Sequence, residues 1–312
     1  MLPLTAAELE EAYGGLPSEI KNTPLVRART PGLRLKLETL QPTGAYKIRA
    51  AWTALARVQD RARQYGAALS SSGNFAGAFT WAAKRLGVPA HLVFTPSVSG
   101  LKVRLAQQYP CTIHRCEDRY EARYELLQSL ADQGIVTIDH RVDRNVFLGH
   151  ATIGWECSAH LALFERALIP LSTGGLAIGI ASALRLKGFR GPILGVQPAG
   201  NPTLHQSWQE GRPVTTGRAS TCCDALTATS VPQEAFDLLR SLLDGVLLVE
   251  EASVLAAVRY LLTEEGVVAE PGASVGMAAV LEGQAPADGT LLVLSGRNVE
   301  PELLARVLQT GS

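Results

Sequence analysis

One lysine stands at a change from strand-like to helical sequence, where its amine can do chemistry. Lys47 follows a break formed by Pro42 and Gly44 and lies in or beside the first turn of a helical pattern that continues to Gly66. The N-terminal end of a helix is unfavourable for a cation. If the lysine is also partly stripped of water, its pKa falls and it can act as a nucleophile or form a Schiff base. A solvated surface lysine is the alternative, and this stretch alone leaves both interpretations open.

Two further turns, rich in small and hydroxyl-bearing residues, follow predicted buried strands. Residues 70–74 connect a strand to a helix over about 75–86, and residues 172–175 lead into a glycine- and alanine-rich helix. Free N–H groups at a helix start bind carboxylates and phosphates. We therefore expect two anion-binding loops, although a serine N-cap or a closely packed turn would give similar residues. The second loop has neither the GxGxxG spacing of a dinucleotide fold nor the GK[ST] ending of a P-loop.

The elements that must position these residues alternate between strand and helix along the whole chain. Such an order predicts parallel sheets, which bind their ligands outside the carboxyl ends of the strands. We expect an α/β fold in two lobes, with open, mostly parallel twisted sheets flanked by helices. A helix is expected to begin at Gly149, which places His150 near the start of that helix.

Composition excludes several classes of function. Lysine plus arginine equals aspartate plus glutamate, at 29 each in 312 residues, so the net charge predicts no nucleic-acid partner. The longest apolar runs are too short for a membrane span. Five cysteines without CxxC pairing, and no secretory signal pattern, predict reduced thiols and a cytoplasmic protein.

Six segments resemble, in order and spacing, the fold-type II pyridoxal phosphate enzymes of the tryptophan synthase beta superfamily. The similarity is to the threonine/serine dehydratase and serine racemase branch and extends over nearly the whole chain from about Asn22. It implies a two-lobed fold, pyridoxal 5'-phosphate as cofactor and a homodimer. The segments are KLETLQPTGAYKIRAA, SSSGNFAGAFTWAAKRLGVPA, FLGHATIGWE, PLSTGGLAIGIASAL, EPGASVGMAAVL and LSGRNVE.

The resemblance also implies roles for individual residues. Lys47 would be the Schiff-base lysine and the base that removes the substrate's Cα proton, and Ser72 would act on the opposite face of Cα in racemase-like members. Around the cofactor, Asn74 would contact the phenolic oxygen, Ser295 the pyridine nitrogen and Glu270 the ring. The phosphate would be held by Ser172, Thr173, Gly174, Gly175 and Leu176. Contacts to the substrate would come from Ser71, Ser72, Gly73, Asn74, Phe75 and His150.

The implied activity is elimination of water, then ammonia, from a small β-hydroxy amino acid such as threonine or serine, which leaves a 2-oxo acid. A β-replacement synthase similar to cysteine synthase, an amino-acid racemase and a cofactor-binding protein without activity are the alternatives. The small, mobile lobe is expected over residues 45–148. The large lobe would combine residues 1–44 with 149–312.

Four departures from the family pattern bear on specificity. The loop 172–175 reads STGG where dehydratases usually have four glycines, and hydroxyl-bearing versions resemble the β-replacement branch. Phe75 replaces a common histidine and His150 a common glutamine, both expected to border the substrate pocket. Gln197 and Thr203 stand where racemase-like members have acidic metal ligands, so no divalent metal is expected.

Overall fold

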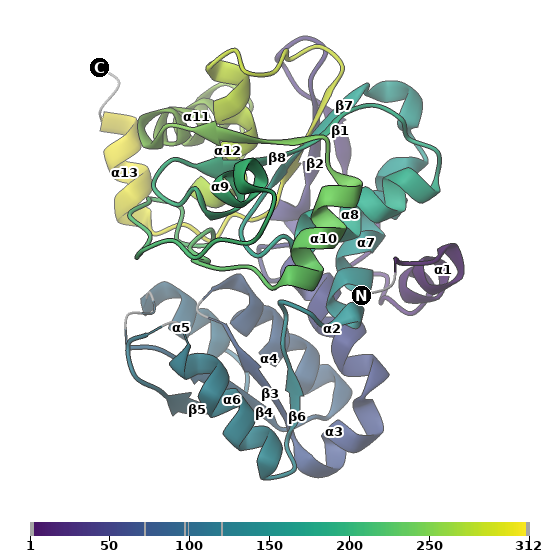
Figure 1. Ribbon diagram of the computed structural model, residues 1–312, viewed down its shortest axis with the longest axis vertical. Helices are drawn as coiled ribbons and strands as arrows, with labels where there is room; N and C mark the ends of the chain where they lie inside the picture. The colour runs from purple at the N-terminus through teal and green to yellow at the C-terminus, as the bar shows by residue number, and fades with distance from the viewer. Residues whose placement is uncertain (1–2, 72, 97, 99, 120, 310–312) are drawn as a thin grey trace.

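The computed structural model describes residues 3–71, 73–96, 98, 100–119 and 121–309. Figure 1 shows two lobes, one above the other, each built around a sheet flanked by helices. The expected α/β fold with mostly parallel sheets is confirmed. In the part of the chain that the structure describes, no helix combines the length and the apolar character needed to cross a membrane.

The smaller sheet has four parallel strands in the order β5-β4-β3-β6. Apolar side chains bury its central strands, and Ala68 and Val93 pack against Leu127 and Leu130 of a covering helix. The strands and helices of this lobe follow one another along the chain from α3 to β6. Its strands are β3 Ala67–Ser70, β4 Ala90–Phe94, β5 Thr112–Arg115 and β6 Val136–Ile138, and its helices are α3 Gln59–Tyr65, α4 Asn74–Leu86, α5 Gly100–Ala106 and α6 Ala122–Asp132.

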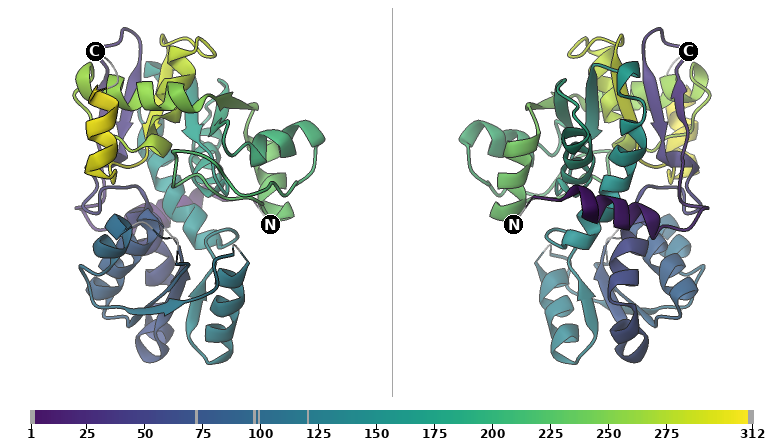
Figure 2. Two further views of the ribbon diagram at one scale, coloured as in Figure 1. Left: turned by 90° about the vertical axis from the view of Figure 1, so that its left-hand side faces the viewer. Right: turned by 90° about the vertical axis from the view of Figure 1, so that its right-hand side faces the viewer.

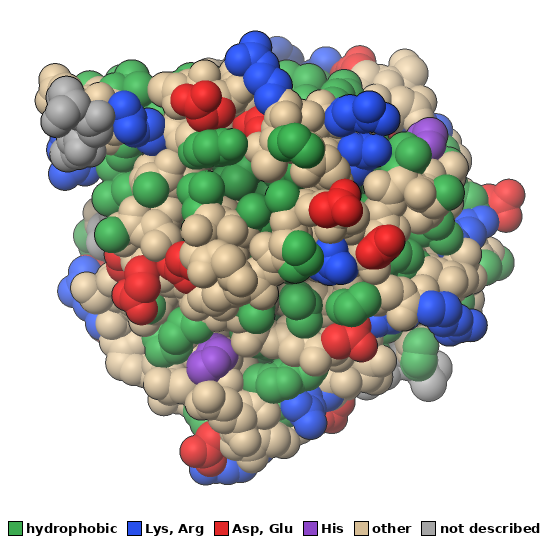
Figure 3. Space-filling model, turned by 90° about the horizontal axis from the view of Figure 1, so that it is seen from above, with side chains coloured by type: hydrophobic (Ala, Val, Ile, Leu, Met, Phe, Trp, Pro, Cys, Tyr) green, Lys and Arg blue, Asp and Glu red, His purple; other side chains and the backbone are tan. Residues whose placement is uncertain are grey.

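The larger sheet has six strands in the order β1-β2-β10-β7-β8-β9, and only the β1–β2 pair is antiparallel. Basic and acidic side chains are intermixed on the face shown in Figure 3. The strands are β1 Leu25–Arg27, β2 Arg34–Leu37, β7 Arg166–Pro170, β8 Ile193–Pro198, β9 Gly245–Val249 and β10 Thr290–Leu294. Its helices are α1 Ala6–Gly14, α7 Arg144–Ser158, α8 Gly175–Leu186, α9 Thr203–Glu210, α10 Gln233–Leu242, α11 Glu251–Thr263, α12 Pro271–Leu281 and α13 Pro301–Gln309, with short 3-10 turns η1 Glu38–Leu40 and η2 Leu161–Leu163. Helix α2 Lys47–Arg57 joins the lobes, because it packs on both α4 and α7.

Small residues allow α7 to pack closely against two neighbouring helices. A Cβ atom added to Gly179 of α8 would lie 2.6 Å from the backbone N of Ala151, and one added to Gly149 would lie 2.5 Å from Cα of Ala50 in α2. Distances below 3.0 Å leave no room for a side chain, so glycine is required at both positions. The N-terminal helix α1 also packs on α7, alongside the junction of the lobes (Figure 2).

Two predicted helix boundaries are corrected. The helical pattern after Gly44 forms two helices, α2 and α3, which are separated at Val58. Helix α7 begins at Arg144, not at Gly149, because Oδ1 of Asp143 accepts a hydrogen bond from the backbone N–H of Asn145 (2.8 Å) and caps the helix. The expected lobe boundary at residues 148 and 149 therefore falls inside α7.

A buried ion cluster ties α2 to the larger lobe. Nε of Arg49 lies 2.9 Å from Oε2 of Glu38, and Nη1 lies 2.8 Å from Oε1 of Glu156. Arg49 and Glu38 are fully buried, and Lys36 pairs with Glu156 at 2.5 Å. Because each buried charge has an opposite partner at hydrogen-bond distance, the cluster fixes η1, α2 and α7 relative to one another.

Replacing Arg49 with Met tests this cluster. The substitution leaves Glu38 buried without its cation, so we expect the free energy of unfolding to fall by about 3 kcal/mol or more. Urea denaturation of wild type and variant measures the difference. Arg119→Met, which breaks exposed pairs with Glu117 and Glu125, is the control and should change stability by less than about 1 kcal/mol. Equal effects of the two substitutions would contradict a special role for the buried cluster.

Candidate active site

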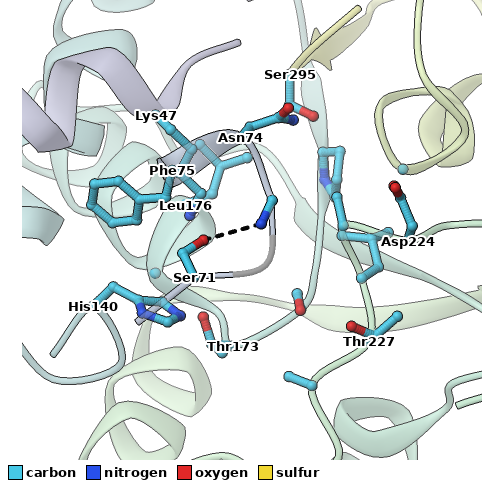
Figure 4. A pocket seen from close by; sticks show the side chains of 18 of the residues that line it. Lys47, Ser71, Asn74, Phe75, His140, Thr173, Leu176, Asp224, Thr227 and Ser295 are labelled. Atoms are coloured by element: carbon cyan, nitrogen blue, oxygen red, sulfur yellow. Dashed lines mark hydrogen bonds between the residues drawn. The ribbon is translucent and has the colours of Figure 1, made fainter. Parts of the chain in front are cut away.

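One cavity gathers residues that follow the carboxyl ends of strands from both lobes. Ser71 follows β3, His140 follows β6, Ser172 follows β7 and Ser295 follows β10, and all four line this cavity (Figure 4). This is the edge at which parallel sheets bind ligands. The wall is completed by Lys47, Gly73, Asn74, Phe75, Thr173, Gly174, Gly175, Leu176, Asp224 and Glu270, among others.

Lys47 is the first residue of α2, and aromatic rings surround its amine. Nζ lies 4.6 Å from the centroid of the Tyr46 ring and 5.1 Å from that of Phe75. No described residue lies within hydrogen-bond or ion-pair distance of this amine. Burial lowers the pKa of Lys47 to about 7, and the carboxylate of Glu270 opposes this shift. A neutral, nucleophilic amine is therefore available near physiological pH.

Glu270 and Asn74 form a buried polar pair beside the lysine. Nδ2 of Asn74 donates to Oε1 of Glu270 (2.6 Å), while Oδ1 of Asn74 accepts from Nδ2 of Asn298 (2.9 Å). Asn74 belongs to the smaller lobe and both partners to the larger one, so these two hydrogen bonds connect the lobes. Oε2 of Glu270 is buried and has no partner among the described residues, and burial raises the pKa of this carboxyl group. A buried oxygen in this state indicates a missing ligand.

The loop over residues 172–176 has the backbone conformation of an anion cradle. Gly174 has a φ of +87°, and a Cβ atom there would lie 2.5 Å from Cδ1 of Leu239. Glycine is therefore required, and the turn brings the first N–H groups of α8 to the cavity. The arrangement suits a phosphate group.

The loop over residues 71–75 forms the opposite wall. Oγ of Ser71 accepts a hydrogen bond from the backbone N–H of Gly73 (3.3 Å), drawn dashed in Figure 4, and α4 begins immediately afterwards at Asn74. Phe75 is 2% exposed and closes this side of the cavity. Ser72, the predicted second catalytic residue, lies outside the described residues.

The structure does not bring His150 to the cavity, contrary to prediction. Its ring is fully buried against Tyr46, with centroids 4.8 Å apart, and it is not among the described residues that line the cavity. Burial holds the pKa of His150 well below its usual range. The earlier start of α7 explains the error, because His150 lies well inside the helix and packs behind Tyr46 instead of facing a ligand.

Other polar residues that line the cavity were not among the predicted site residues, for example Arg123, Tyr124, His140 and Asp224. Of these, His140 had a usable signal, since it follows β6 by the strand-end rule that located the serine loops. Burial, followed by the charge of Lys47, lowers the pKa of His140 to about 3, so its imidazole is neutral. Asp224 belongs to a loop whose position depends on tertiary contacts, such as its ion pair with Nζ of Lys102 (2.6 Å).

The positions where related racemases would carry acidic metal ligands form neutral contacts. Oε1 of Gln197 accepts from the backbone N–H of His205 (2.8 Å), and Oγ1 of Thr203 donates to Oδ1 of Asn201 (2.9 Å). Across the described ranges, no group of three or more histidine, cysteine or acidic side chains is arranged to hold a metal ion. The expected lack of a divalent cation stays a prediction.

Comparison with known proteins identifies the family of this chain. The model for pyridoxal-phosphate dependent enzymes matches residues 16–296. The chain belongs to this family. It is 29% identical to phenylserine dehydratase from Ralstonia pickettii, over 89% of this chain and 86% of the relative.

Two solved structures show the same fold over nearly the whole length of both proteins. A threonine deaminase from T.th. is 30% identical, with a TM-score of 0.87 over 95% of this chain and 99% of the other. Maize serine racemase is 26% identical, with a TM-score of 0.90 over 99% and 98%. The family cofactor fits the residues present, because three features lie around one cavity: the half-buried amine of Lys47, a buried oxygen of Glu270 that no described residue hydrogen-bonds, and an anion loop that requires glycine.

The lowered pKa of Lys47 predicts how the reactivity of its amine depends on pH. The amine is protonated below pH 7 and neutral above it, so its rate of modification by trinitrobenzenesulfonate should rise through an inflection near pH 7. Mass spectrometry of the apo-protein measures modification at this residue. A lysine-containing peptide is the control, because a model lysine titrates at about 10.4. A Lys47 profile that matches the peptide would contradict the burial argument.

Proposed function

We propose that this protein is a pyridoxal-phosphate-dependent ammonia-lyase that dehydrates and deaminates a small β-hydroxy amino acid such as threonine or serine. The observation that carries the proposal is the half-buried amine of Lys47, which lies against the rings of Tyr46 and Phe75 in the cavity that the anion loop and the Asn74–Glu270 pair also line. Relatives named as a threonine deaminase and a phenylserine dehydratase support the same reaction class. The products would be a 2-oxo acid and ammonia.

Residues of both lobes would hold the cofactor. The backbone of residues 172–176 would bind its phosphate, Asn74 its phenolic oxygen and Ser295 its pyridine nitrogen, with Glu270 near the ring. When bound, this cofactor makes the Cα–H bond of an amino acid acidic by delocalising the electrons left behind. A serine hydroxyl at the ring nitrogen cannot give up a full proton as a carboxylic acid can, which favours prompt loss of a β-substituent over transamination.

Lys47 and the loop over residues 71–75 would act on the substrate. The loop would bind the substrate carboxylate through hydroxyl groups and the N–H groups at the start of α4. Lys47 would accept the Cα proton as a general base, a role for which a pKa of about 7 is well matched. Phe75 and Tyr46 would exclude water from the amine, because their rings cover it.

Contacts between the lobes would form or break as the smaller lobe moves. We propose that residues 45–148 close over the substrate toward residues 1–44 and 149–312. Nζ of Lys102 in α5 pairs with Oδ2 of Asp224, and the backbone N–H of Leu101 donates to Oε1 of Glu300 (3.3 Å). A homodimer and a cytoplasmic location stay predictions, and light scattering of the purified protein measures the former.

Racemisation is the second candidate function, because maize serine racemase shares the fold at a TM-score of 0.90. The two activities give different products from L-serine. Elimination forms pyruvate, whereas racemisation forms D-serine and, in D2O, introduces deuterium at Cα. Assays of keto acid and of D-serine on one reaction mixture separate them. Consumption of an added thiol or amine, with formation of a β-substituted amino acid and without keto acid, would indicate β-replacement instead.

Lys47→Ala should lower the rate of keto acid formation from threonine or serine at least about a thousandfold, because the substitution removes both the residue that would bind the cofactor and the base. A coupled dehydrogenase assay measures the keto acid. Lys84→Ala is the control, since Lys84 is an exposed lysine that also lies over an aromatic ring, that of Tyr109. It should retain wild-type activity. Keto acid formation by Lys47→Ala at the wild-type rate would contradict the assignment.

A further inference from the structure

His140 lies at the cavity and has no hydrogen-bond partner among the described residues. It lines the wall, Nδ1 is buried without a hydrogen bond, and no described residue hydrogen-bonds to either ring nitrogen. Buried polar groups in proteins are nearly always paired. An imidazole left unpaired at a ligand cavity therefore indicates that the ligand provides the partner.

The neighbours of His140 fix its ring without pairing with it. Its ring meets that of Phe75 edge to face, with centroids 5.9 Å apart, and lies 6.4 Å from that of Tyr124. The adjacent carboxylate of Asp139 is held by Arg141, with Oδ2 2.6 Å from Nη2. Asp139 raises the pKa of His140, but burial and the charge of Lys47 outweigh it, and no described carboxylate hydrogen-bonds to the imidazole, which stays a neutral hydrogen-bonding group.

His140 lies next to the residues proposed to act on the substrate's carboxylate and Cα. Phe75 belongs to the loop proposed to bind the carboxylate, and its ring contacts both Lys47 and His140. In Figure 4, His140 faces the cavity on the side of Thr173, away from Ser295. If the loop binds the substrate's carboxylate and Lys47 lies at its Cα, the substituents on the β-carbon would lie next to the rings of Phe75 and His140. Phe75 offers an apolar surface there, and His140 the polar one.

We propose that His140 binds the β-hydroxyl group of the substrate and so makes the enzyme selective for hydroxylated amino acids. This inference rests on the proposed function and assigns to His140 the recognition of the β-hydroxyl group that leaves. A neutral imidazole can donate to or accept from a hydroxyl, while it offers no charge to a carboxylate or an ammonium group. The hydrogen bond orients the C–O bond that breaks, and the neighbouring phenyl ring accommodates hydrogen or a methyl group.

The first test compares leaving groups. β-Chloro-L-alanine loses chloride, which needs no hydroxyl contact, whereas L-serine loses its hydroxyl group. His140→Phe keeps the ring in an apolar corner and removes both nitrogens. We expect kcat/KM for serine to fall about tenfold to a hundredfold, as for loss of one or two hydrogen bonds to a substrate. The value for β-chloroalanine should stay within about threefold of wild type.

Two further variants serve as controls. His140→Gln retains an amide at a similar reach and should recover part of the activity toward serine. His160→Phe changes an exposed histidine and should change neither value. Melting temperatures show that the variants are folded. Equal losses with serine and β-chloroalanine in His140→Phe, or no loss with either, would contradict the proposal.

A binding measurement without turnover gives an independent test. α-Methylserine has no Cα–H bond and cannot be dehydrated, and 2-aminoisobutyrate is the same molecule without the hydroxyl group. Calorimetric titration of the holoenzyme should show tighter binding of α-methylserine by about fivefold or more, and His140→Phe should abolish this preference. An unchanged preference contradicts the role of His140. Failure of the wild type to eliminate chloride from β-chloroalanine would instead contradict the proposed function.

Discussion

The buried guanidinium of Arg49 fixes the end of α2 at which the site lysine lies. It is held by Glu38 on one side and Glu156 on the other, so one side chain joins the turn after β2, the start of α2 and helix α7. Lys47 precedes it by half a helical turn and points to the cavity instead. The close packing of α7 on α2 at Gly149 holds together the same two helices that the cluster joins.

The two basic residues at the start of α2 lie in opposite environments, and this difference explains why only Lys47 is suited to chemistry. Arg49 is given two carboxylates and stays charged. Lys47 is given aromatic rings, while the nearby carboxylate of Glu270 is engaged by Asn74. A buried amine without an ionic partner loses its proton more easily, and this makes it a nucleophile and a base. The ion cluster provides the rigidity, and the aromatic pocket provides the reactivity.

Sequence patterns located much of the fold and several walls of the cavity. Strand–helix alternation and the rule that ligands bind at carboxyl ends predicted the parallel sheets and drew attention to residues 70–74 and 172–175. The failures came from interactions that a pattern does not record. The cap at Asp143 lay within a charged stretch that reads as a loop, so α7 was begun too late and His150 was misplaced. The unpaired state of His140 depends on Arg141 engaging the adjacent acid, which only a structure shows.

The central claim is that the cofactor is attached to Lys47, and one measurement tests it most directly. The holoenzyme is reduced with borohydride and digested, and the lysine that carries the phosphopyridoxyl group is identified by mass spectrometry. The account predicts a single modified site, Lys47, and no modification in Lys47→Ala. Attachment to another lysine, such as the buried Lys36 or Lys102, or no attachment at all, would contradict it.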